Sequence, residues 1–348
     1  MPLLSVVVPV YRVEEFLPDC LDSILDQDFT DVEVIAVDDA SDDGCAAILA
    51  RYAARDSRVR VLTLPANRGL GAARNAGLAA ATGDYVWFVD SDDWLTPGTL
   101  AAVAARLAET DADLLVTGFA RVWPDGELRH SQVSAAGPAP DVFRLDEVPG
   151  LLGILHIACN KVIRRRLLVD LGLAFRPGWY EDVAFSLPLM IAADRITLLD
   201  RYSYAYRQRD TGAITRTVSD RHFEVFDQWG FVFHFLDDRP PSSLRGPVFE
   251  RAIWHLLQVL GHAARVPRGR RREFFGRLVA LYRAHRPAQG YRIPPGDEGI
   301  KHRLVARNAF LLFEALRAGR KMRVRLVRRP AVPQQRDTAK APTADAVP

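Results

Sequence analysis

The stretch 85–93, with the sequence YVWFVDSDD, decides the predicted fold of this chain. Its first five residues favour a β-strand, and the next four positions hold three aspartates, Asp90, Asp92 and Asp93. Aspartate and serine favour turns, so the acids mark the point where the strand ends. In an open α/β sheet, ligands bind outside the carboxyl ends of the strands. The stretch therefore predicts a buried strand that delivers carboxylates to a ligand-binding edge.

Clustered carboxylates repel one another unless a cation neutralises them. A hard divalent ion such as Mg²⁺ or Mn²⁺ suits oxygen ligands and commonly bridges to a diphosphate. The alternative is a solvated Asp-rich turn before a helix that begins near Thr96-Pro97. The rest of the N-terminal half favours the ligand site.

Strand-like and helix-like segments alternate through the first 120 residues. Alternation of this kind predicts a doubly wound, mostly parallel sheet. The expected strands are 5–9, 32–37, 59–64, 85–90 and 113–119, and the expected helices are 14–27, 43–55, 70–81 and 96–109. Further helices are expected over 220–236, 248–264, 273–286 and 301–320.

Composition excludes several classes of protein. The three cysteines are widely spaced without metal-ligand spacing, so neither a disulfide framework nor a structural zinc site is expected, and a reducing cytoplasm fits. The N-terminal residues lack the pattern of a signal peptide, and the apolar runs are too short to span a membrane, so neither a leader nor a membrane-spanning helix is expected. Residues 265–329 hold 19 Lys and Arg against 4 Asp and Glu, a net charge of +15. Because the whole chain carries +3 and the tail from residue 330 is neutral, residues 1–264 carry a net charge of about −12. An acidic body with a basic C-terminal module indicates a polyanionic partner or an anionic membrane surface.

Other polar groups follow the predicted strands. Tyr11 comes after Pro9 at the end of the first strand, and Asp39 ends the second, where a carboxylate can accept hydrogen bonds from a nucleobase or ribose. The stretch 67–77, NRGLGAARNAG, opens a helix whose free N–H groups favour anions and carries Arg74 on its first turns. It reads G-x-G-x-x-R and follows the third strand, so it is not a dinucleotide fingerprint.

A last pair of acids, Glu181 and Asp182, stands between aromatic residues before an apolar helix. Beside apolar rings the pKa of a carboxyl group can rise, which suits a general base. The alternative is that the two acids only cap the helix. Downstream, Arg207 and the alternating tyrosines before it either contact phosphates or pack.

These elements together resemble the family 2 glycosyltransferases of GT-A fold over about residues 3–217. The matching motifs are SVVVPVY at 5–11, VDDASDDG at 37–44, N…GAARNAG at 67–77, FVDSDDW at 88–94 and YEDVAF at 180–185. The resemblance implies an inverting transferase in which Pro9, Tyr11, Asp39, Arg74 and Asp90 bind a nucleotide-sugar donor, UDP-linked by expectation. It also implies a divalent metal (Mg²⁺ or Mn²⁺) on the D-x-D acids, Asp92 and Asp90, and a base, Asp182, supported by Glu181. The Gln-x-x-Arg-Trp motif of processive synthases is absent near 207–210.

The resulting expectation is a GT-A domain at 1–218, with a nucleotide-sugar half at 1–95 and an acceptor half at 96–218. A helical basic module follows at 219–329, and a disordered tail at 330–348. The expected acceptor is a cell-envelope glycan, a polyanionic polymer or a lipid-linked acceptor. Two other functions stay open: nucleotidyl transfer, and non-catalytic binding of a sugar nucleotide. No nucleic-acid reading motif is found.

The basic module itself has three interpretations. Its apolar stripe around 310–316 packs on the catalytic domain, or it lies on the inner face of the cell membrane as an amphipathic helix. In the third, its arginines bind a phosphate-rich acceptor polymer. We expect a cytoplasmic protein that is peripheral on the membrane.

Overall fold

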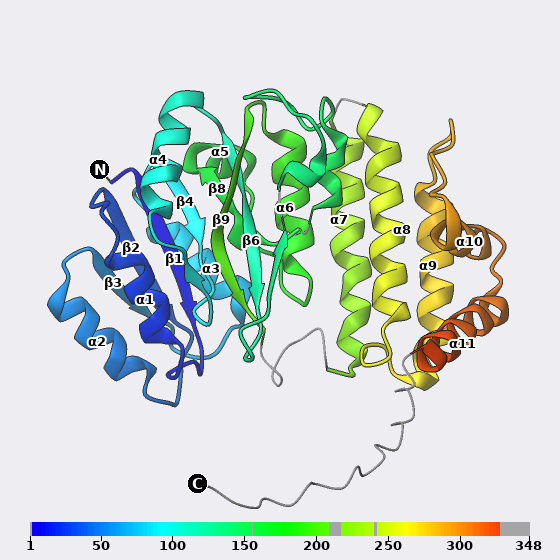
Figure 1. The fold of residues 1–348 in the computed structure, drawn as a ribbon, viewed down its shortest axis with the longest axis horizontal. Helices are drawn as coiled ribbons and strands as arrows, with labels where there is room; N and C mark the ends of the chain where they lie inside the picture. Colours follow the sequence, from blue (N-terminus) through cyan, green and yellow to red (C-terminus); the bar gives the residue numbers. More distant parts are fainter. Residues whose placement is uncertain (1, 132, 155, 209–216, 240–241, 328–348) are drawn as a thin grey trace, which may run out of the picture.

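A nine-stranded sheet organises the computed structural model, which describes residues 2–131, 133–154, 156–208, 217–239 and 242–327. The strand order is β3-β2-β1-β4-β8-β6-β9-β5, with β7 paired to β6. Figure 1 shows β1 between β2 and β4. The strands are β1 (Leu4–Val10), β2 (Val32–Asp38), β3 (Val59–Thr63), β4 (Tyr85–Phe88), β5 (Trp94–Leu95), β6 (Leu114–Val122), β7 (Leu128–Ser131), β8 (Lys161–Arg164) and β9 (Ile196–Arg207).

The N-terminal half of the sheet is parallel. Strand β1 lies between β2 and β4, so that Val7 pairs with Ile35 on one side and Phe88 on the other. Strand β8 joins this half to β6 through antiparallel pairs with β4 and β6, and β6 then pairs in parallel with β9. Parallel pairing brings the carboxyl ends of β1, β2 and β4 to one edge, the edge that the acids follow.

Helices cover both faces of the sheet, as the alternation of segments predicts. Val6 and Val8 of β1 lie in one apolar cluster with α1 (Leu17–Leu25), α2 (Cys45–Arg55) and α4 (Thr99–Thr110). Val7 points the other way, into a cluster with α3 (Leu70–Ala80), α5 (Arg165–Leu171) and α6 (Glu181–Ala192). Burial on both faces explains why β1 is a continuous apolar run. The doubly wound prediction is confirmed.

The C-terminal region is helical, as predicted, and lies beyond α6 in Figure 1. Its apolar residues share one cluster with the sheet, since Val7, Ile253 and Phe274 belong to the same buried set. The division of the chain at 218/219 stays a prediction, and the tail 330–348 lies outside the described residues. The helices are α7 (Val225–Asp237), α8 (Arg245–Gly261), α9 (Arg271–His285), α10 (Gly296–Ala306) and α11 (Phe310–Val327). None of the helices in the described part of the chain combines the length and apolar character that a membrane span needs.

Several predicted boundaries are displaced: the helix expected over 14–27 is Leu17–Leu25, the α-helix expected from 220 begins at Val225, and the one expected over 248–264 is Arg245–Gly261. Two further differences have a local physical reason. The helix expected at Thr96-Pro97 begins at Thr99, because Gly98 adopts a left-handed conformation (φ 72°) that interrupts the helix, and Thr96 instead donates its hydroxyl hydrogen to the carbonyl of Tyr202 beside the short strand β5. The single helix expected over 301–320 is two helices, because Asn308 adopts a left-handed conformation (φ 52°) between α10 and α11.

Candidate functional site

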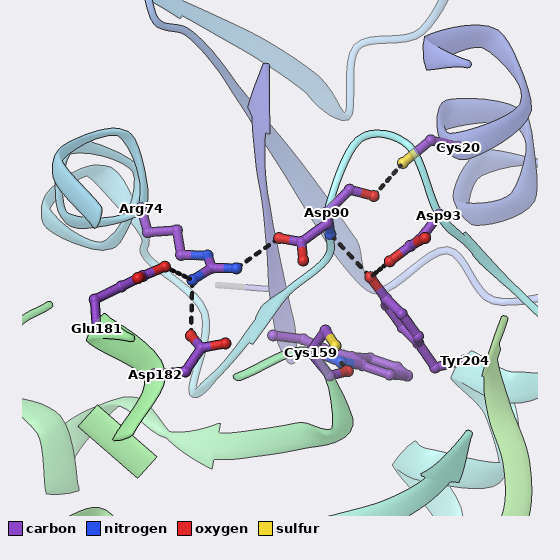
Figure 2. A network of polar contacts seen from close by, with 9 residues as sticks. Cys20, Arg74, Asp90, Asp93, Cys159, Glu181, Asp182 and Tyr204 are labelled. Carbon is purple, nitrogen blue, oxygen red and sulfur yellow. Dashed lines mark hydrogen bonds and ion pairs between the residues drawn. The ribbon is translucent and has the colours of Figure 1, made fainter. Parts of the chain in front are cut away.

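The carboxyl ends of the parallel strands and the start of α6 bring the predicted acids together around one arginine. Asp90 follows β4, Arg74 lies on α3, and Glu181 and Asp182 are the first two residues of α6. Figure 2 shows these four side chains converging, although more than 100 residues separate Arg74 from the α6 acids. The sequence predicted each of the four individually, and the fold makes them one cluster.

Arg74 is the centre of that cluster and is only 1% exposed. Its Nη2 donates to Asp90 at 2.7 Å, and its Nη1 donates to Asp182 at 2.8 Å and to Glu181 at 3.2 Å. The guanidinium also lies over the ring of Phe175, 5.0 Å from its centroid. An arginine this deeply buried is stable only with paired charges, and here it has three.

The cluster holds more negative than positive charge. Burial and the neighbouring charge of Asp182 raise the pKa of Glu181 to about 7, although Arg74 opposes the shift. Burial also raises the pKa of Asp182, again against Arg74. Because Asp182 accepts the shorter bond from Arg74, it is the carboxylate better held in its ionised form. A carboxylate kept ionised near a titrating neighbour suits proton abstraction at neutral pH.

The aspartates after Asp90 differ in their surroundings. Asp93 is fully buried, accepts hydrogen bonds from the hydroxyl of Tyr204 and the backbone N–H of Arg207, and has a pKa raised by burial and by Asp92. It fastens the acidic loop to β9. Asp92 is half-buried, and its backbone carbonyl accepts a bond from Arg207 Nε at 2.8 Å. Asp92 is therefore the more accessible of these two acids.

The Arg207 side chain packs between aromatic rings, and its contact with a phosphate stays a prediction. Its guanidinium lies between the rings of Phe16 and Trp94, at 4.9 Å and 4.7 Å from their centroids. It also donates to Asp19 at 2.9 Å.

The donor set fits a divalent cation only with help from a substrate. Among the described residues, no group of three or more His, Cys, Asp or Glu side chains could hold a metal ion. Magnesium, however, is commonly held by one or two carboxylates plus substrate phosphates. The uncompensated negative charge around Asp90, with Asp92 two residues on, suits an ion bound in that way.

The remaining predicted donor-binding residues lie at the same sheet edge. Both carboxylate oxygens of buried Asp39 accept backbone N–H groups at 2.7 Å, from Arg68 and Gly69, so Asp39 shapes the glycine loop. Gly69 has φ +87°, a conformation that a side chain would strain. Pro9 is buried in β1, and Tyr11 is 39% exposed just beyond it.

Sequence reasoning missed Lys161, which is 1% exposed at the start of β8. Its Nζ donates to the carbonyl of Ile157 at 2.7 Å and to Asn160 Oδ1 at 2.8 Å. Burial lowers its pKa to about 8, and the nearby charge of Asp182 opposes that shift. No local pattern marks Lys161, because a lysine that opens a short strand is ordinary until its burial is known.

Comparison with known proteins agrees with this architecture. A family model described as Glycosyl transferase family 2 matches residues 5–172. The chain is 33% identical over 245 residues to the uncharacterized glycosyltransferase EpsJ of Bacillus subtilis (strain 168), across 67% of this chain and 70% of EpsJ. It is 32% identical over 213 residues to the poly(ribitol-phosphate) beta-N-acetylglucosaminyltransferase TarS of Staphylococcus aureus (strain Mu50 / ATCC 700699), across 60% of this chain and 36% of TarS.

Solved structures share the fold. S. aureus TarS 1-349 in complex with UDP-GlcNAc superposes with a TM-score of 0.71 over 82% of each chain at 23% identity. The mannosyltransferase PcManGT from Pyrobaculum calidifontis, in complex with GDP-Man and Mn²⁺, gives a TM-score of 0.52 over 94% of this chain and 85% of that one at 20% identity. The GT-A-type fold with a helical C-terminal region is confirmed.

Proposed function

Because this chain belongs to the family 2 glycosyltransferases, we propose that it transfers a sugar with inversion from a UDP-linked donor to a hydroxyl group of a cell-envelope acceptor. The acceptor is a glycan, a polymer or a lipid-linked saccharide. The observation that carries the proposal is the cluster in which Arg74 joins Asp90 to Asp182 and Glu181. It links the edge where a nucleotide sugar binds to a candidate base.

Donor binding is assigned to the edge formed by β1, β2 and α3. We assign the nucleoside to Tyr11, which is exposed after β1, and to Asp39, which orders the loop before α3. The similarity to TarS, whose structure contains UDP-GlcNAc, supports a UDP-linked donor. Pro9 and Arg74 complete the proposed donor set, with Arg74 acting through the acids that it holds.

Asp182 is the proposed base. Its carboxylate removes the proton from the acceptor hydroxyl, whose oxygen then attacks the anomeric carbon from the face opposite the diphosphate. The bond from that carbon to the diphosphate oxygen breaks, and one in-line displacement inverts the configuration. The 2.8 Å bond from Arg74 supports this role, because it favours the ionised form that can accept a proton. Glu181, with a pKa of about 7, shares the arginine and supports the base.

Asp92 and Asp90 are the proposed ligands of a divalent ion. When bound, Mg²⁺ or Mn²⁺ would stabilise the negative charge of the leaving diphosphate. Accessible Asp92 is the first choice as ligand, because Asp90 already accepts a bond from Arg74. The Mn²⁺ of PcManGT supports metal use in this fold.

A panel of nucleotide sugars tests the proposal. The purified chain is incubated with each donor, with and without EDTA, and release of the nucleoside diphosphate is measured. For the active donor, NMR of the freshly formed product reads the anomeric configuration. We expect one UDP-sugar to react with inversion and with metal dependence. Release of sugar 1-phosphate, with the nucleoside monophosphate passed to an acceptor or to water, would indicate nucleotidyl transfer instead, and binding without turnover would indicate a non-catalytic protein.

Peripheral attachment to an anionic membrane surface is the proposed role of the last helix. Phe313 of α11 is buried against Phe275 of α9, whereas Leu311 is 79% exposed and Leu312 63% exposed. Part of the apolar stripe thus packs, and part faces outward on a helix rich in Lys and Arg. An amphipathic helix at a membrane uses the same combination.

A double variant tests membrane attachment without opening the core. Leu311→Ser with Leu312→Ser removes only exposed apolar groups, and Leu128→Ser on β7, 53% exposed, is the matched control. The double variant should lose co-sedimentation with anionic vesicles, while the control and the unmodified chain should bind. Equal binding of all three proteins would remove the membrane role.

A further inference from the structure

Helix α8 presents an arginine and a histidine toward the segment that carries the proposed base. Arg251 and His255 are four residues apart and therefore lie on one face of the helix. The His255 ring contacts the Tyr180 ring edge-on, with centroids 5.4 Å apart, and Tyr180 directly precedes Glu181 and Asp182. Helix α8 lies beyond α6 and α7 as seen from β1 and β2 in Figure 1.

Arg251 is held rigidly, yet without a carboxylate. Its Nε donates to His156 Nε2 at 3.0 Å, its Nη2 donates to the carbonyl of Ile154 at 3.3 Å, and its guanidinium lies 4.0 Å from the Trp254 ring centroid. No ion pair joins Arg251 to any acid in the described part of the chain. A half-buried cation without a counter-charge carries an uncompensated desolvation cost. Burial alone lowers its pKa to about 10.

Hydrogen-bond donors remain available around this cation. A guanidinium has five N–H groups, and the two contacts above leave most of them unused. The Nδ1 atom of His255 accepts a hydrogen bond from Trp229 Nε1 at 3.1 Å, so the neutral imidazole carries its own hydrogen on Nε2. Burial and the charges of Arg251 and Arg265 lower the pKa of His255 to about 3, which keeps it neutral at physiological pH. Positive charge on Arg251 and Arg265 thus flanks a neutral N–H donor.

We propose that Arg251 and His255 bind a phosphoryl group of the acceptor, with Arg265 adding positive charge. A planar guanidinium fork matches phosphoryl oxygens, and the Nε2–H of His255 supplies a further donor. The site rests on the proposed function, because its place beside Tyr180 puts a bound acceptor next to Asp182. The substrate class is then a phosphate-bearing acceptor, either a polyol-phosphate polymer or a phosphate-linked saccharide.

Isothermal titration with a short phosphodiester-linked polyol tests the site, and the same polyol without phosphate is the parallel ligand. Arg251→Gln should weaken binding of the charged oligomer about 10- to 100-fold, the usual range for a lost charge-assisted hydrogen bond. Arg283→Gln removes the same charge from an exposed position on α9 and should bind normally. His255→Phe keeps an aromatic ring against Tyr180 but removes the N–H, and should also weaken binding.

Three results would overturn the inference. Equal affinity of the unmodified chain for the charged and uncharged polyols would remove the phosphoryl group as ligand. Equal losses in Arg251→Gln and Arg283→Gln would reduce the effect to general electrostatics. A matching loss of UDP affinity in Arg251→Gln would assign the cation to the donor diphosphate. If Arg251→Gln does not fold, Arg251→Lys is titrated in its place, because it keeps the charge but lacks the planar guanidinium. Unchanged affinity in Arg251→Lys would reject recognition of the phosphoryl group by the guanidinium fork.

Failure of this site and failure of the proposed function give different readouts. Donor hydrolysis by the unmodified chain measures the transferase activity and uses no acceptor phosphate. A chain that hydrolyses a UDP-sugar but binds both polyols equally keeps the proposed function and loses this site. Melting temperatures with excess inorganic phosphate add a check, since a ligand of the folded state raises the midpoint in the unmodified chain and should raise it less in Arg251→Gln.

Discussion

Replacing Asp182 with asparagine removes the proposed base while keeping the shape of the side chain. The neighbouring charges predict how the cluster responds. Arg74 keeps Asp90 and Glu181 as partners, so the arginine stays paired and the fold should persist. The charge of Asp182 is one cause of the raised pKa of Glu181, so that pKa should fall in the variant. The loss should therefore be one of chemistry and not of structure.

The expected size of the loss follows from general-base catalysis. Removing a positioned base lowers turnover by about 10²–10⁴, which corresponds to about 3–5 kcal/mol of activation free energy. Donor affinity should change little, because Arg74 keeps Asp90 and Glu181 as partners in the variant and the nucleoside is assigned to Tyr11 and Asp39. Glu181→Gln is the matched control in the same cluster, with a smaller expected loss because Glu181 accepts the longer bond from Arg74.

Steady-state kinetics with the active donor measures turnover, and titration of UDP measures donor affinity, so the two effects are separated. In the unmodified chain, kcat should rise with pH through a limb near 7, where Glu181 loses its proton beside the base, and then level off. In Asp182→Asn that limb should disappear along with the turnover. A variant that keeps its turnover but binds the donor weakly would refute the reasoning and make Asp182 a donor-binding residue.

Three further outcomes are expected. Asp92→Ala should remove most activity, at a cost of several kcal/mol of transition-state stabilisation, and keep the melting temperature; full turnover in EDTA would reject the metal assignment. Glu181 has a pKa of about 7 in the fold, against an ordinary value of 4.5. Its protonated form therefore stabilises the folded state at low pH by about 3 kcal/mol, and this contribution is lost as the pH rises from 4.5 through 7. Glu181→Gln should therefore gain stability relative to the unmodified chain between pH 5 and pH 8 in denaturant titrations, and a constant difference would contradict the shift. Gly77→Ala places a Cβ 2.3 Å from Val7 Cγ1 and should destabilise the fold by about 1–3 kcal/mol. Gly276→Ala, in open space on α9, should stabilise it by up to about 1 kcal/mol in the same titration, and similar effects of both changes would refute the packing argument.

Local sequence signals predicted most of the N-terminal elements because each depends on nearby residues. The strand β4 could be predicted from its apolar run, and the start of α3 from Gly69 and the residues after it. The start of α4 was predicted three residues early, because neither the left-handed conformation of Gly98 nor the pairing of Thr96 with Tyr202, 106 positions away, could be inferred from the chain. Such pairing has no local signature in the chain.

The candidate site also combines features that nearby residues predict with features that depend on distant contacts. The acids and Arg74 stand out as residue types in unusual positions, and the family motifs add their order. One arginine pairs with three of the acids, whereas Asp93 accepts a hydrogen bond from Tyr204. Both pairings depend on how β4, α6 and β9 meet in the fold. Lys161 escaped notice because a single lysine before a strand is ordinary until its burial is known.

The conformation of Tyr180 connects the helical module to the chemistry. Tyr180 has φ 65°, a left-handed conformation that costs a non-glycine residue of order 1–3 kcal/mol and persists only where its surroundings hold it. Residues of the C-terminal region supply those contacts: its hydroxyl group bonds to His222 Nδ1 at 2.6 Å, and its ring packs against His255. Because α6 begins immediately after this residue, Glu181 and Asp182 occupy the helix N-terminus, where free N–H groups favour carboxylates. Because the C-terminal helices share one apolar cluster with the sheet, these contacts to Tyr180 help to position the proposed base.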